Sequence, residues 1–306
     1  MTGEEEIVFQ PAKRPCVYVR QRRKKVVFAI SSFVLGQCYK EIRHAVANPG
    51  SRNMKQSFRG TRPRIWFKHE EPDLLEMTGD EFVDQFTGLC GLNYRGFVVV
   101  IRMMWEVELT WMTPAQRNRW RHILLPLWAE LVAYDKNYLA NSKVKEMFTS
   151  EVWGYDLRCC RMIMAPRRDR EQYWTLYAID MSECIVHVLD PRDSCIGEER
   201  LLEKHSGICE KLITGLGKCA REFCKGWEVV PEKFTYKCHE ELHGPADIDE
   251  SAFDMVHYFK YFDGKSLVNG RSKEWNKQLK GNVLQMVLGM KGNKGCPPKG
   301  VLAPEV

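Results

Sequence analysis

The sequence has neither a long apolar run nor a CxxC pair of cysteines, although Cys159 and Cys160 are adjacent. No hydrophobic stretch approaches the ~18–20 residues that a helix needs to cross a bilayer, so we expect no membrane span. The 12 cysteines include no CxxC pair, and the acidic start MTGEEEIVFQ lacks the basic and apolar segments of a signal peptide. These absences argue against a secreted, disulfide-bonded protein and favour a reducing cytosolic or nuclear setting with free thiols.

The charge balance excludes little more. A net charge of +6 over 306 residues is mild, and much of it comes from the N-terminal region. It therefore gives no reason to expect nucleic-acid binding by the whole chain. Hydrophobic residues make up 44% of the sequence and charged residues 28%, which is ordinary for a folded protein of one large or two modest domains.

Basic residues gather in one segment, KRPCVYVRQRRKK at 13–25. Such clusters serve as nuclear-import signals and equally as solvated basic arms, and nucleic-acid binding by this segment stays open. Residues 49–64 are rich in Gly, Pro, Ser and Arg, which is typical of a linker. We therefore predict a basic, flexible N-terminal arm and linker over residues 1–68, and we favour the nucleus over the cytoplasm.

Regular patterns begin near residue 70. Thr78 is placed to cap a helix over residues 79–91, which has acidic residues in its first turn. Residues 97–109, FVVVIRMMWEVEL, begin with β-branched residues and favour a strand. The segment after Thr113 predicts a helix that Pro126 ends or kinks.

The second half of the chain alternates strands and helices. Residues 158–166 predict a short buried strand, and YWTLYAID with CIVHVLD predicts a hairpin joined by MSE. Helical periodicity covers 198–224 and 272–290, and residues 251–262 predict a helix capped by Ser251. Because these elements follow no regular βαβ count, the predicted class is α+β.

Three of these stretches carry a resemblance to a known family: YWTLYAID, the strand that ends at Asp190, and DESAFDMVHYFKYFDG at 249–264. Together they resemble the Ulp-like cysteine proteases that process SUMO and related ubiquitin-like modifiers, in particular the plant and transposon-associated branch. That family reads His-Trp-x-Leu-x-x-Ile-Asp, then a turn, a strand and an aspartate, and later Asp-Cys-Gly at the start of an apolar helix. The likeness is best over residues 150–290.

The resemblance implies a papain-like α+β architecture of the SUMO-protease and adenain type, with a mixed sheet packed by helices. It implies a domain over residues 69–290, followed by a loose C-terminal tail at 291–306. It also implies cysteine-type peptidase chemistry without a cofactor, and SUMO or another ubiquitin-like protein as the partner.

Carried over position by position, the resemblance leaves most catalytic positions substituted. The base histidine falls on Tyr173, the orienting aspartate is kept as Asp190, and the nucleophilic cysteine falls on Ser251. The glutamine of the oxyanion hole falls on Glu241, or on Pro245 when counted back from the helix.

A second retained position is Trp174. It matches the tryptophan that lines the passage for a Gly-Gly tail in the family, although an alternating strand would supply an interior aromatic there anyway. Both interpretations stay open at this point.

These substitutions change the chemistry. Tyr173 carries a phenol with a pKa near ~10 and is a poor base at neutral pH, whereas a serine at position 251 would need a better base than a cysteine does. A carboxylate at Glu241 would repel the charge that an oxyanion hole must stabilise, and losing one such donor costs ~10²–10³ in rate. We therefore predict a catalytically inactive Ulp-like peptidase domain. A module that binds a ubiquitin-like protein without catalysis is an alternative, as is an enzyme that uses Ser251 or the HEELH segment in a rearranged geometry.

Two other sites fit the sequence less well. HEELH at 239–243 matches the zinc-protease pattern, in which two histidines one helical turn apart bind the metal. The motif needs the middle of a helix, but a strand-like segment precedes it and Gly-Pro follows. A serine triad of Ser251 and Asp190 with His243 or His257 is a second alternative, although His257 lies six positions beyond Ser251 on the same helix and points away from it.

Overall fold

The computed structural model describes residues 64–86, 91–111, 121–134, 136–193, 196–240, 242, 247–267 and 273–297. The predictions for residues 1–63 of the N-terminal arm, for Thr113, and for Glu241, His243 and Pro245 therefore lie outside the described residues. No described helix is both long and apolar enough to cross a bilayer.

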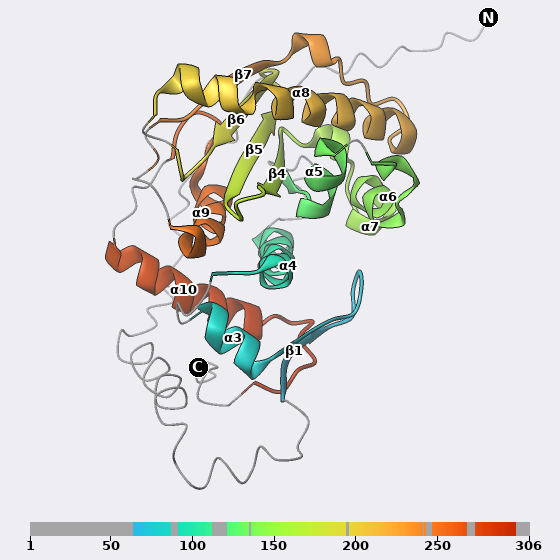
Figure 1. Cartoon of the computed structure of the whole chain (residues 1–306). Coiled ribbons are helices and arrows are strands. Elements are labelled where there is room, and N and C mark those ends of the chain that lie inside the picture. The colour runs from blue at the N-terminus through green and yellow to red at the C-terminus, as the bar shows by residue number, and fades with distance from the viewer. Residues whose placement is uncertain are drawn as a thin grey trace, which may run out of the picture.

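The core of the protein is a five-stranded mixed sheet in the order β3-β4-β5-β6-β7 (Figure 1). Its strands are β3 (Arg121–Ile123), β4 (Met162–Arg168), β5 (Trp174–Asp180), β6 (Ile185–Leu189) and β7 (Thr235–Cys238). β4, β5 and β6 pair antiparallel, whereas the outer strands β3 and β7 pair parallel with their neighbours. The predicted buried strand and hairpin are confirmed.

Helices cover both faces of this sheet, and its central strand is therefore buried on both sides. Every residue of β5, WTLYAID, is buried, as expected for a strand sandwiched between layers. Helices α5 (Pro126–Ala133) and α8 (Glu198–Phe223) lie on one face, and α9 (Ile248–Tyr261) and α4 (Tyr94–Trp111) lie on the other (Figure 1).

The remaining elements surround this arrangement. The hairpin of β1 (Ile65–His69) and β2 (Leu75–Thr78) leads into α3 (Gly79–Phe86), and α10 (Lys273–Leu288) packs against α3, α4, α9 and β1. Short helices connect the sheet strands: η1 (Tyr138–Ala140), α6 (Ser142–Phe148), α7 (Ser150–Trp153), η2 (Leu157–Cys159) and η3 (Pro231–Lys233). With helices on both faces of a mixed sheet, the predicted α+β class is confirmed.

The cap predicted at Thr78 is confirmed. The Glu81 N–H donates to the Thr78 hydroxyl at 3.3 Å, and the Thr78 N–H donates to the Glu81 carboxylate at 2.7 Å. This reciprocal pair is a capping box, which satisfies two N–H groups at the start of α3.

The strand predicted at 97–109 is wrong, because these residues lie within helix α4. The β-branched run Val98–Ile101 is buried on every side, together with Phe97. An apolar run of this kind cannot be assigned from periodicity, since a fully buried helix and a buried strand share the pattern. Burial between the sheet and α10 outweighs the small intrinsic helix penalty of β-branched residues.

The role predicted for Pro126 is also wrong. Residues 121–123 form strand β3, and Pro126 is the first residue of α5 instead of the end of a helix. Proline is well suited to this position because it lacks an N–H that would have no partner in the first turn, and its φ angle is already helical.

Helix α9 begins earlier than predicted. It starts at Ile248 with Asp247 as its N-cap residue, so Ser251 is a residue of the helix and not its cap. Helices α8 and α10 agree with the predicted segments. The shift at α9 matters for the site, because it places the Ser251 side chain against the sheet.

Candidate active site

Three of the predicted site positions lie at one end of the sheet. Tyr173 directly precedes β5 and Asp190 directly follows β6, and the antiparallel register pairs Leu176 with Leu189. The first turn of α9 packs at the same end, where the Trp174 N–H donates to the Ser251 hydroxyl at 3.3 Å. The fold thus brings together residues that are up to 78 positions apart in the sequence.

Ser251 is fully buried and its hydroxyl is used twice. It donates to the backbone carbonyl of Ile248 at 2.8 Å and accepts from the backbone N–H of Trp174 at 3.3 Å. Its exposed fraction is 0%. A substrate carbonyl would have to reach a buried atom whose proton is held by a backbone oxygen, so the hydroxyl is placed for a structural role.

Asp190 does not face Tyr173. Its carboxylate accepts hydrogen bonds from Lys204 at 2.6 Å and lies 3.0 Å from His205 Nε2, both on helix α8. The backbone N–H of Arg192 donates to the other oxygen at 2.9 Å. Burial opposes ionisation of this group, but the hydrogen bonds from His205 and Lys204 outweigh it and hold the pKa of Asp190 well below its usual range.

His205 continues the network into the protein. Its Nδ1 lies 2.9 Å from the hydroxyl of Tyr177 on β5, and both side chains are buried. Burial raises the pKa of Tyr177 well above its usual value. The result is a buried chain, Asp190–His205–Tyr177, on the α8 side of the sheet.

Sequence reasoning missed His205. The one signal in the sequence is its place on the apolar stripe of α8, where Leu201, Cys209 and Leu212 follow helical spacing and are also buried. A lone polar residue on a buried stripe indicates a buried partner. It does not indicate which residue that partner is.

Tyr173 turns toward Arg192. The guanidinium carbon of Arg192 lies 4.5 Å from the centre of the Tyr173 ring, a cation–π geometry. The backbone N–H of Tyr173 donates to Asp169 at 2.8 Å. Tyr173 and Asp190 therefore have different partners in the described structure, Arg192 for the ring and helix α8 for the carboxylate.

Trp174 is an interior aromatic. Only 1% of its surface is exposed, and its ring centre lies 4.0 Å from that of Phe97 on α4. Of the two interpretations of this residue, the packed core residue is the one that the structure shows, because a side chain this buried lines no open passage.

The described part of HEELH is not helical. The backbone N–H of His239 donates to the Val188 carbonyl at 3.1 Å, which extends the pairing of β7 with β6. The His239 ring instead meets His187, with 3.1 Å between Nε2 and Nδ1. Among the described residues, no group of three or more His, Cys, Asp or Glu side chains is placed to hold a metal ion.

The buried His187 and the half-buried His239 pack together with Phe262. The ring centres of the two histidines are 5.2 Å apart, and Phe262 packs edge-on against both. Burial lowers the pKa of His187 and of His239 to about 4. Both imidazoles are therefore neutral at pH 7.

The arrangement of sheet and helices is that of a SUMO-processing cysteine protease domain. The chain has the fold of the Ulp1 protease domain solved in complex with SMT3, the yeast ortholog of SUMO, with a TM-score of 0.54 and 13% identity over 82% of this chain and 96% of that one. Ulp1 with its catalytic cysteine oxidised to a sulfinic acid matches with a TM-score of 0.52 and 11% identity, over 85% and 97% of the two chains.

These likenesses concern the fold. The sequence matches no family model, and no curated protein is detectably similar to it.

Proposed function

We propose that this chain is a Ulp-like peptidase domain that has lost peptidase activity and acts by binding a ubiquitin-like protein. One observation carries the loss of activity: the residue at the nucleophile position, Ser251, is buried with both hydrogen-bonding sides of its hydroxyl occupied. A nucleophile must be reachable and must have a base beside it. Tyr173 at the base position faces Arg192 instead.

The network of Asp190 supports the same proposal. In the proteases that this chain resembles, the matching aspartate orients the histidine at the position of Tyr173. Here it is held by Lys204 and His205 on helix α8. A carboxylate committed to two cationic or hydrogen-bonding groups stabilises the fold and orients no base at position 173.

Retained binding is supported by the fold. The matching Ulp1 structure is a complex with SMT3, so a domain of this shape offers a surface that accommodates a ubiquitin-like protein in at least that relative. Binding does not require the nucleophile, and so it can persist after the catalytic positions have changed. The plant and transposon-associated origin inferred from the sequence is part of this proposal.

Three measurements test the proposal. Calorimetric titration of the full chain with SUMO and with ubiquitin should show saturable binding to at least one of them. The same proteins carrying a C-terminal electrophile should give no covalent adduct with the chain, and the matching precursors should not be cleaved. Capture that Ser251→Ala abolishes would overturn the inactive assignment, and absence of binding to both modifiers would overturn the binding assignment.

The basic segment at 13–25 leads to a separate proposal of nuclear localisation. A fluorescent fusion of the full chain should accumulate in the nucleus, and replacing the Lys and Arg residues of this segment by Ala should release it to the cytoplasm. An equal distribution of both fusions would contradict this proposal.

A further inference from the structure

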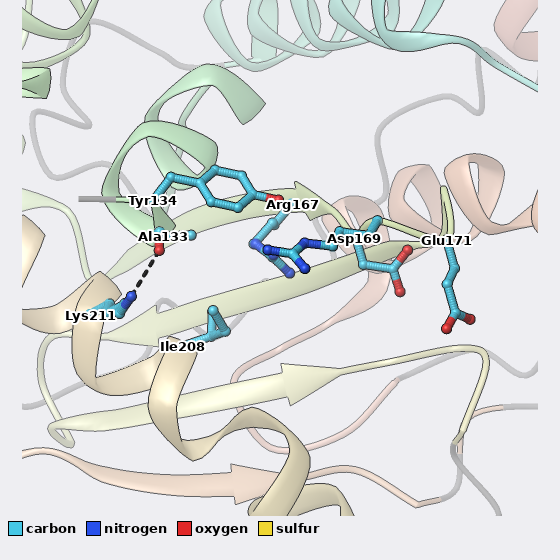
Figure 2. Close-up of a pocket in the computed structure, with 8 residues that line it drawn as sticks. Ala133, Tyr134, Arg167, Asp169, Glu171, Ile208 and Lys211 are labelled. Carbon is cyan, nitrogen blue, oxygen red and sulfur yellow. Dashed lines mark hydrogen bonds between the residues drawn. The ribbon is translucent and has the colours of Figure 1, made fainter. Parts of the chain in front are cut away.

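A pocket lies on the opposite side of the sheet from Ser251, against helices α5 and α8 (Figure 2). It is an open depression of about 670 Å³. Its wall is formed by the end of α5, the end of β4 with the turn that follows, and one face of α8: Ala133, Tyr134, Arg167, Asp169, Arg170, Glu171, Ile208 and Lys211. None of the catalytic positions lines it.

Three cationic side chains from three different elements line this pocket. Arg167 comes from β4, Arg170 from the β4–β5 turn, and Lys211 from α8. In Figure 2 the labelled Arg167 side chain lies near the Tyr134 ring, with Ile208 and Lys211 on the α8 side. Within the described residues, no carboxylate lies within 4.0 Å of any of these three groups.

The two acidic residues of the wall face a cation outside the pocket, Arg192, which they share with Asp193. Arg192, outside the pocket, forms an ion pair with Glu171 and lies 3.8 Å from Asp169. Asp169 also accepts the backbone N–H of Tyr173 at 2.8 Å. The two acids thus contact Arg192. Within the described residues they form no ion pair with the three cations of the pocket.

One further acid, Glu130 on α5, lies near the pocket. Burial raises its pKa, whereas Arg167 and Arg168 act to lower it. A single half-buried carboxylate does not balance three cations. The Arg167 side chain forms a hydrogen bond that acts on the buried Tyr177 hydroxyl, but its Nε is buried and has no hydrogen-bond partner among the described residues. A buried donor without a partner is destabilising unless a ligand satisfies it.

One of the cations, Lys211, and the turn that carries Arg170 are held in place before a ligand arrives. Lys211 donates to the Ala133 carbonyl at 2.9 Å, which fixes its ammonium at the end of α5. The turn that carries Arg170 is closed by the Asp169 N–H, which donates to the Tyr173 carbonyl at 2.8 Å. Preorganised groups lose little entropy on binding.

We propose that this pocket binds a phosphomonoester that carries an aromatic or aliphatic portion. Arginine pairs with phosphate oxygens through two parallel N–H bonds, and lysine adds a point charge. Three cations suit a dianion better than a single carboxylate. The half-exposed Tyr134 ring and Ile208 supply an apolar wall for the organic part. The ligand is either a free phosphorylated metabolite or a phosphorylated side chain of a partner.

Calorimetry on the full chain in phosphate-free buffer tests this inference. Phenyl phosphate should bind saturably and more tightly than inorganic phosphate, whereas phenol should not bind. Arg170→Gln and Lys211→Gln should each weaken the affinity about tenfold, because each removes a charged hydrogen-bond donor. Lys218→Gln and Arg221→Gln, both exposed positions of α8 outside the pocket, are matched controls and should leave the affinity unchanged.

The two possible sources of the phosphate are separated by a second arm. A peptide with a phosphotyrosine should compete with phenyl phosphate if the ligand is a modified side chain, and its failure to compete would assign the pocket to a free metabolite. Absence of saturable binding of phenyl phosphate, or equal binding by the pocket variants and the controls, would overturn the inference. Since modifier binding is measured separately, failure here leaves the proposed function intact.

Discussion

The imidazole of His205 lies 3.0 Å from the carboxylate of Asp190, with both groups buried between the sheet and helix α8. This contact fixes the direction of the one acidic residue that the catalytic pattern retains. It joins the end of β6 to a helix, and through Tyr177 it reaches the middle of β5. The aspartate therefore stabilises the sheet–helix interface.

Asp190→Asn should destabilise the domain by about 3 kcal/mol, because it removes the buried charge that His205 faces and leaves Lys204 paired with Asp193 alone. Urea unfolding followed by circular dichroism measures the change. Asp193→Asn is the matched control, since Asp193 also pairs with Lys204 but is partly exposed, and it should cost under ~1 kcal/mol. Equal losses for the two variants would contradict the assigned role of Asp190.

Ser251→Ala should lower stability by about 1–2 kcal/mol without any change in peptidase activity. The substitution leaves the buried Trp174 N–H without its acceptor. Thermal unfolding and a fluorogenic precursor assay, both on the same preparations, give the two readouts. A loss of turnover in this variant would show that the wild-type serine is a working nucleophile.

The double variant Tyr173→His and Ser251→Cys should not regain peptidase activity. The new imidazole would lie beside Arg192, which disfavours its protonated form, and Asp190 would remain bound to α8. Turnover of a ubiquitin-like precursor is the measurement, with Ulp1 as the positive control. Saturable cleavage by the double variant would mean that these two positions alone account for the inactivity.

Stability should fall as the pH is lowered from about 6.5 to about 4. The folded pKa values of His187 and His239 are about 4, below the ~6.5 expected in the unfolded chain. Between these pH values the unfolded state binds more protons than the folded state, so acid favours unfolding. For each histidine, the loss of stability is at most about 1.4 kcal/mol for every unit by which its folded pKa is lowered. Above pH 6.5 neither state is protonated and the effect vanishes.

Urea unfolding at a series of pH values checks this prediction. His187→Gln should flatten the profile between pH 4 and 6.5, whereas His69→Gln in the β1–β2 hairpin serves as the control variant. A profile whose slope in this interval is the same in His187→Gln and in the wild type would contradict the role of the pair.

Local patterns were sufficient for much of the fold. The alternation of YWTLYAID and CIVHVLD predicted the β5–β6 hairpin, and the helical spacing of residues 198–224 predicted α8. Thr78 with Glu81 predicted the start of α3. Each of these signals is written within a few neighbouring residues, so it can be interpreted without knowledge of the rest of the chain.

Other features depended on distant partners. The run FVVVI at 97–101 has the same apolar pattern whether it forms a strand or a buried helix, and only packing between the sheet and α10 decides for the helix. Ser251 was expected to cap α9, but the helix begins three residues earlier and turns the hydroxyl toward Trp174.

The sequence by itself determined that residue 173 carries a phenol and residue 251 an alcohol, at the positions that the resemblance matches to an imidazole and a thiol. The tertiary structure alone decided what the retained Asp190 does. Its partners, Lys204 and His205, lie on a helix whose approach to the sheet is set by packing over its whole length. No pattern of neighbouring residues encodes which buried groups meet across such an interface.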